Sequence, residues 1–261
     1  MTKNTFLPNA ALLWLGGLFG AVAVIPYSLA INPGGMAQAA EQTGLTQNTL
    51  LILSLVQSAV LLAIMSFAGL WAARKLGLGT PMIESLLRRQ GLPARIGRHL
   101  RNAVFLGIAC SMSIILLDAG LFAATLDSAV GESIRIEPWK GFLASFYGGI
   151  SEEIQLRLFF LSFMALALRW VARRFGVEGE LPAGVFWSAN ILAALAFGLG
   201  HLPATAAIME ITPMVVIRAV LLNGILALVT GQLFRRHGLE VAIVCHFSAD
   251  IVLHVLFPLI R

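Results

Sequence analysis

Residues 49–73 read TLLILSLVQSAVLLAIMSFAGLWAA, a stretch with no Asp, Glu, Lys, Arg or His. A helix needs about 20 mostly apolar residues to cross the hydrocarbon core of a bilayer, so this stretch predicts a transmembrane helix. Comparable stretches lie on both sides of it. We expect seven spans, at about 11–31, 49–73, 103–126, 141–168, 183–202, 213–234 and 239–260. The sequence therefore predicts an all-α integral membrane protein, a bundle of about seven transmembrane helices.

The overall composition agrees with a membrane protein. Of the 261 residues 58% are hydrophobic and 12% charged, against roughly 25% charged in an ordinary soluble domain. Seven spans take up about 140 residues and leave short loops, so we expect residues 1–261 to form a single membrane domain. The net charge of +5 is attributed to loops on the cytoplasmic side rather than to nucleic-acid binding. Cys110 and Cys245 both fall in apolar runs and give no disulfide framework.

The loops alternate in charge. Residues 74–102 form a basic loop with seven Lys and Arg, whereas residues 32–48 have none. Continuing along the chain, basic residues return in the loops after the fourth and sixth spans, at Arg169, Arg173, Arg174, Arg235 and Arg236. Because cytoplasmic loops are rich in Lys and Arg, this alternation predicts the N-terminus inside and the C-terminus outside. A cleaved signal peptide ending at Ser28-Leu29-Ala30 is the alternative for the first run, which is long for such a peptide.

The fourth span contains charged residues in the sequence Ser151-Glu152-Glu153-Ile154-Gln155-Leu156-Arg157. Charge inside a span is costly and marks a functional or paired site. Glu153 and Arg157 are i,i+4 neighbours on a helix and can neutralise each other. Glu152 has no such partner, so its carboxylate is a candidate general base.

Two later spans also carry titratable side chains. Phe197 and His201 share a face at the end of the fifth span, and Pro203 follows. His246 and Asp250 are i,i+4 neighbours in the seventh span. Acids and imidazoles on three separate spans predict one clustered site rather than three structural residues.

These residues resemble the motifs of the CPBP family, which comprises CAAX-type prenyl endopeptidases and bacteriocin-processing relatives, also called glutamic intramembrane proteases. The family motifs are E-E-x-x-x-R, F-x-x-x-H and H-x-x-x-N or D, and here they stand in that order across residues 141–255. The last position departs from the commoner Asn, because this chain has Asp250. The resemblance suggests a catalytic four-span core at 127–261, with residues 1–126 as three accessory spans.

The resemblance implies an intramembrane endopeptidase. Glu152 and His201 would hold and deprotonate the attacking water, while His246 and Asp250 would stabilise the oxyanion. Supporting roles fall to Glu153, Arg157 and Phe197. No acyl-enzyme is expected, because no Ser or Cys stands beside a base. The implied partners are the lipid bilayer and a peptide or protein substrate, including membrane-anchored or prenylated ones, and the implied location is a prokaryotic plasma membrane.

Three alternatives remain open. The chain could be a catalytically silent scaffold or binding protein of the same fold, or a proton- or ion-coupled transporter, since intramembrane acids and histidines also serve ion paths. The protease could also use zinc, although no H-E-x-x-H pair occurs and we expect no metal or other cofactor. The expected depths of the two histidines in the membrane conflict with a shared site. Counting about 1.5 Å per residue from the predicted span boundaries, His246 lies about 10 Å from the inner surface and His201 about 27 Å from it.

Overall fold

The computed structural model describes residues 5–123, 136–179 and 181–260, and within these ranges it contains helices and no strand. Helices labelled η are π-helical. In chain order the elements are α1 (Phe6–Ala23), α2 (Ile25–Ile31), α3 (Gly35–Thr43), α4 (Gln47–Arg74), α5 (Pro81–Leu87), α6 (Ile96–Leu117), η1 (Asp118–Phe122), α8 (Pro138–Phe146), η2 (Tyr147–Glu152), η3 (Ile154–Leu161), α9 (Ser162–Arg174), α10 (Ala183–Gly200), α11 (Leu202–Ala206), α12 (Pro213–His237), α13 (Leu239–Asp250), η4 (Ile251–Leu256) and α14 (Phe257–Ile260).

Seven of the described helical segments are long and apolar enough to cross a membrane, so the predicted fold class is confirmed. They are Phe6–Ile31, Gln47–Arg74, Ile96–Phe122, Pro138–Arg174, Ala183–Ala206, Pro213–His237 and Leu239–Ile260. Many apolar side chains on these helices are exposed, such as Ile52 (60%) and Phe105 (63%). Such a surface suits contact with lipid rather than with water.

The third and fourth spans differ most from their predicted limits. The third begins at Ile96 rather than at 103, so Arg98 and Arg101 lie on its first turns and not in a loop. The fourth runs from Pro138 to Arg174, because the helix continues past the apolar core as an extension ending in arginines. The expected end of the third span, at 126, lies outside the described residues.

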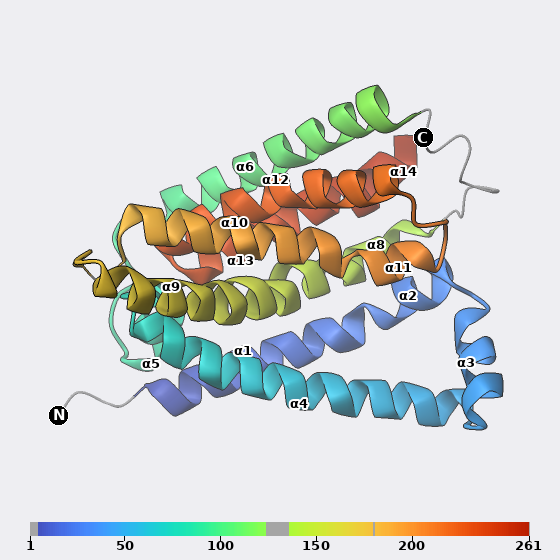
Figure 1. Ribbon diagram of the computed structural model, residues 1–261. Helices are drawn as coiled ribbons and strands as arrows, with labels where there is room; N and C mark the ends of the chain where they lie inside the picture. Colours follow the sequence, from blue (N-terminus) through green and yellow to red (C-terminus); the bar gives the residue numbers. More distant parts are fainter. Residues whose placement is uncertain (1–4, 124–135, 180, 261) are drawn as a thin grey trace.

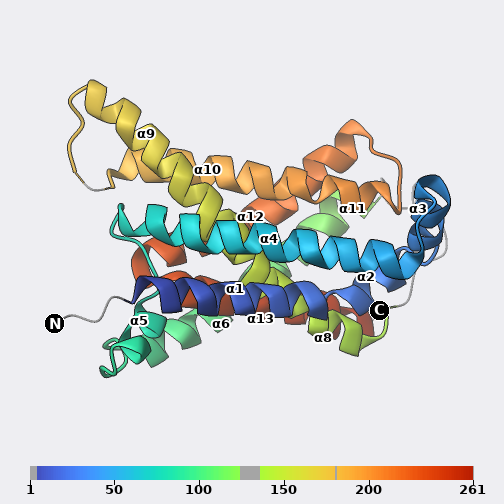
Figure 2. The ribbon, with the colours of Figure 1, turned by 90° about the horizontal axis from the view of Figure 1, so that it is seen from below.

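The long helices run side by side, with their ends gathered at two opposite ends of the bundle (Figures 1 and 2). One end carries α5 and the turn between α9 and α10, and the other carries α3, α11 and α14 (Figure 1). Close packing depends on small residues at helix crossings. At Gly107 in α6 an added Cβ would collide with the backbone oxygen of Cys245 in α13, so only glycine allows these helices to approach so closely.

Within the described residues, four π-helical segments interrupt the spans. In π-helices the backbone hydrogen bonds run from i to i+5, and such turns are frequent at functional sites. Here η2 and η3 flank Glu153 in the fourth span, η1 begins at Asp118, and η4 contains His254. Each segment therefore contains or adjoins a polar side chain inside the membrane, and the sequence pattern did not predict any of them.

Candidate active site

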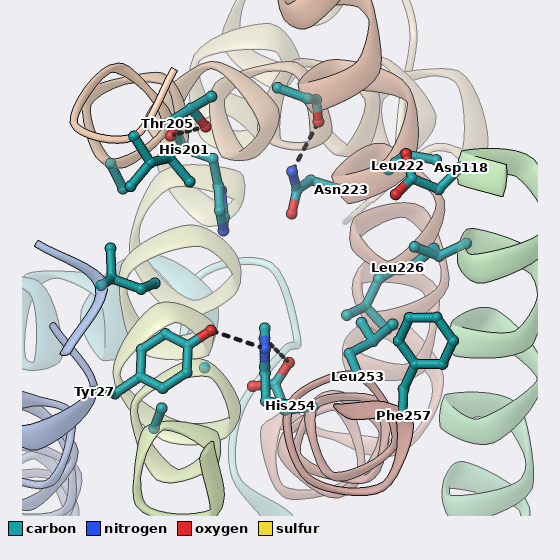
Figure 3. A pocket seen from close by; sticks show the side chains of 18 of the residues that line it. Tyr27, Asp118, His201, Thr205, Leu222, Asn223, Leu226, Leu253, His254 and Phe257 are labelled. Carbon is teal, nitrogen blue, oxygen red and sulfur yellow. Dashed lines mark hydrogen bonds and ion pairs between the residues drawn. The ribbon is translucent and has the colours of Figure 1, made fainter. Parts of the chain in front are cut away.

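A cavity of about 1050 Å³ lies among the ends of several spans. The side chains that line it include Glu152, Phe197, His201, His246 and Asp250. Its walls come from α2, α6, η1, α8, α11, α12, η4 and α14, and are mostly apolar, as Leu222, Leu226, Leu253 and Phe257 show (Figure 3). The cavity thus joins an apolar chamber to a small group of acids and imidazoles, the combination expected of a binding or catalytic site.

The buried centre beside the cavity is a group of three side chains, an ion pair and an imidazole. Glu153 and Arg157 are 0% and 1% exposed, and Arg157 Nη1 lies 3.2 Å from Glu153 Oε1. The same carboxylate oxygen lies 2.7 Å from His246 Nδ1. The ion pair therefore does more than neutralise two charges, because it also holds the imidazole of the seventh span against the fourth span.

The hydrogen bond at Nδ1 determines what the other His246 nitrogen can do. A carboxylate can only accept, so Nδ1 carries the proton and Nε2 faces the cavity side. His246 Nε2 lies 3.6 Å from Glu152 Oε2 and 3.7 Å from Asp250 Oδ1. Neutral His246 can accept a hydrogen bond at Nε2, and imidazolium can donate one there.

Gly148 in η2 makes room for Asp250. A Cβ at this position would collide with the Asp250 carboxylate and would lie 3.3 Å from His246 Nε2. The glycine in the fourth span thus lets the HxxxD segment of the seventh span approach Glu152. A side chain at position 148 is therefore expected to displace the Asp250 carboxylate from the cavity lining.

His201 enters the cavity from the end of α10 (Figure 3). Its Nδ1 lies 2.8 Å from the carbonyl oxygen of Phe197, which can only accept, so Nδ1 is the protonated nitrogen. The Nε2 of neutral His201 is therefore an acceptor for a water or substrate N–H. The Phe197 ring packs edge-on against both imidazoles, with centroids 4.6 Å from His201 and 5.6 Å from His246. On the other side it contacts the Arg157 guanidinium at 4.9 Å.

The structure brings all seven residues singled out in the sequence into one region: Glu152, Glu153, Arg157, Phe197, His201, His246 and Asp250. Glu152 and His201, expected to act on one water, are not in direct contact, since no Glu152 oxygen lies within 4.0 Å of a His201 nitrogen. The nearby imidazole is His246 instead. Glu152 and His201 both line the cavity.

The conflict in depth between His246 and His201 has a structural explanation. The turn between α9 and α10 projects beyond the first turn of α13 (Figures 1 and 2), so α10 starts farther out than the residue count assumed. Residues of α10 are therefore shifted along the bundle relative to α13. As a result Phe197 lies level with His246.

Sequence reasoning missed two features of the cavity wall. Tyr27 Oη lies 3.2 Å from His254 Nδ1, and His254 Nε2 lies 3.9 Å from Asp250 Oδ1 (Figure 3). Arg218 donates two hydrogen bonds to the Asp118 carboxylate, at 2.6 and 2.8 Å. The i,i+4 spacing of Asp250 and His254 could have signalled the first, but neither Tyr27 nor the Asp118–Arg218 pair falls within a motif.

The described residues contain no group of three or more His, Cys, Asp or Glu side chains arranged to hold a metal ion. The fold and the cavity define a polytopic all-helical membrane protein with an acid–imidazole site within the bundle. The family model for type II CAAX prenyl endopeptidase, Rce1-like, matches residues 135–252. The match confirms the resemblance to the CPBP family and includes every motif residue. No curated protein and no solved structure gives a match.

Proposed function

We propose that this protein is an intramembrane endopeptidase that hydrolyses a peptide bond with a water activated by Glu152 and His201. The observation that carries the proposal is that Glu152, His201, His246 and Asp250 line one cavity. The match to a family of CAAX-type proteases supports the same reaction class. Residues 127–261 would form the catalytic core, and the first three spans would complete the cavity wall.

In the proposed reaction Glu152 takes a proton from water while His201 Nε2 orients that water by accepting its second hydrogen. The resulting hydroxide attacks the peptide carbonyl carbon and forms a tetrahedral intermediate. Glu152 then returns the proton to the leaving amine, and the products are a carboxylic acid and an amine. No covalent bond to the protein is needed at any step.

The negative oxygen of the intermediate needs a hydrogen-bond donor. His246 in its imidazolium form donates through Nε2–H, and Asp250 lies 3.7 Å from that nitrogen. Glu153 fixes the ring through Nδ1. A donor that is already in place when charge develops lowers the barrier more than one that must reorganise.

Asp250→Asn should keep appreciable activity, whereas Asp250→Ala should lose most of it, on the order of a hundredfold in kcat/KM. An Asn amide retains an acceptor for His246 and adds an N–H donor for the oxyanion, while Ala offers neither. The measurement is kcat/KM for the three proteins, with thermal unfolding as the folding check. If the Ala variant were as active as the Asn variant, Asp250 would have no part in orienting His246 or in binding the oxyanion.

The function itself is tested with the purified full chain in detergent and a panel of fluorogenic peptides with apolar centres. We expect cleavage at a defined bond, identified by mass spectrometry of both products. Ion flux in proteoliposomes without peptide turnover would favour the transporter instead. A stable, folded protein that binds peptides and cleaves none would favour the silent scaffold.

Activity should persist after treatment with a membrane-permeant chelator of zinc. The proposed nucleophile is generated by a carboxylate and an imidazole, so removing metal should leave kcat/KM unchanged. The measurement compares treated protein, untreated protein and treated protein supplemented with zinc. A complete loss that zinc alone restores would replace the glutamate mechanism with metal-activated water.

A further inference from the structure

The two ends of the bundle differ strongly in charge. The described loops and helix ends around α5, the α9–α10 turn and the α12–α13 turn are rich in Arg and Lys. The opposite end has no Lys or Arg in the turn through α3 or in the turn between α11 and α12. At that end Lys140 is paired with Glu137 at 2.6 Å. Since Lys and Arg remain on the cytoplasmic side of short loops, the α5 end is the cytoplasmic one.

The cavity belongs to the opposite, base-poor end. Its lining comes from α2, η1, α11, the first half of α12 and the last turns of the seventh span. These elements meet at the end that carries α3, α11 and α14 (Figure 1). None of the cavity lining comes from α5, α9 or the α12–α13 turn among the residues described. The charge pattern and the position of the cavity are independent observations, since one depends on loops and the other on the interior of the spans.

The charge inside the cavity adds a second constraint on the substrate. Among the described lining residues Arg218 is the one Lys or Arg, and Asp118 neutralises it through two hydrogen bonds. Glu152 and Asp250 add two carboxylates to the cavity lining. A free C-terminal carboxylate would find no unpaired guanidinium or ammonium there, whereas an uncharged internal segment would match the apolar walls.

From these observations we infer that the site acts on an internal, apolar peptide segment that enters from the extracytoplasmic face. The substrate class is a secreted or membrane-anchored protein whose scissile bond reaches the outer half of the membrane. The inference rests on the proposed protease function for its chemistry, but its sidedness rests on the charge pattern and on the place of the cavity alone.

Sidedness can be measured without any activity. The test uses two variants of the full chain that each add one cysteine, Ile208→Cys in the cavity lining and Gln90→Cys beyond α5. Both side chains are exposed, and the native Cys110 and Cys245 are buried, so the unmodified protein is the blank. In intact bacterial cells a membrane-impermeant maleimide should label Ile208→Cys and leave Gln90→Cys unlabelled. Gln90→Cys should be labelled only after the cells are permeabilised. The reverse pattern would overturn the inference.

Activity is tested in proteoliposomes of known orientation, with an amidated fluorogenic peptide that the protein cleaves in detergent. Peptide supplied on the side where Ile208→Cys is labelled should be cleaved, and peptide supplied on the Gln90 side should not. Cleavage from the Gln90 side would refute extracytoplasmic entry while leaving the protease function intact. Absence of cleavage of every peptide in detergent would instead refute the protease function and, with it, the inferred substrate.

A peptide with a free C-terminal carboxylate next to the scissile bond should be cleaved more slowly than the same peptide with an amidated C-terminus. Faster cleavage of the peptide with the free carboxylate would contradict the inferred substrate class.

Discussion

Glu152→Gln is expected to abolish peptide cleavage while the protein remains folded. Gln is close in size and cannot accept a proton from water, so the loss should reach or exceed the contribution of a general base, about 10²–10⁴-fold in kcat/KM. The side chain of Glu152 is 18% exposed and borders the cavity, which gives the amide room and solvent contact. The measurement is kcat/KM with the same detergent preparation and the same peptide as the wild-type protein.

Two matched variants separate chemistry from folding. Glu178→Gln removes an exposed carboxylate in the turn between α9 and α10, outside the cavity, and should leave both activity and thermal stability unchanged. Thermal unfolding of Glu152→Gln should also match the wild-type protein, because Glu152 does not take part in the Glu153–Arg157 ion pair. Turnover above a few per cent of wild type would exclude Glu152 as the base.

Arg157→Met is expected to damage folding rather than chemistry alone. Methionine replaces the unbranched apolar stem of arginine, so the change removes the guanidinium and leaves the fully buried Glu153 without its cation. Breaking a buried pair in this way costs about 3–5 kcal/mol in soluble proteins, and the cost inside a bilayer is also substantial. The Phe197 ring loses its cation partner as well. The measurement is the yield of monodisperse protein and its thermal unfolding in detergent.

The double variant Glu153→Gln with Arg157→Met provides the control. It removes both charges, and the Gln side-chain oxygen can still accept the hydrogen bond from His246 Nδ1. Because an isolated buried charge causes most of the loss, the double variant should be more stable than Arg157→Met. A well-folded but inactive Arg157→Met protein would assign Arg157 to substrate binding instead of to structure.

The number of spans and the polar residues of the site could be predicted because each follows from the residue types within a single stretch of sequence. A run such as 49–73 has one stable arrangement in a bilayer, and charges inside such runs are rare enough to indicate a site. The pairing of Glu153 with Arg157 follows from helix spacing and is present at 3.2 Å. These inferences needed no knowledge of how the spans pack.

The remaining features depend on packing between spans. Tyr27 and Asp118 reach the cavity from the first and third spans, whose sequences carry no motif. The pairing of Glu152 with His246 depends on the π-helical turns around Glu153 and on Gly148, where two backbones come close. The projecting α9–α10 turn shifted Phe197 along the bundle, and no residue count based on straight spans of equal length could include that shift.

The position of Phe197 has a consequence for how this protein can change. One ring touches the guanidinium of the buried ion pair and the two imidazoles of the site. A substitution there alters the support of the fold and the orientation of the reacting groups in a single step. A substitution of Phe197 that raises stability is therefore expected to change activity, and one that changes activity is expected to change stability. Substitutions that improve only one of these two properties have to be made elsewhere in the bundle.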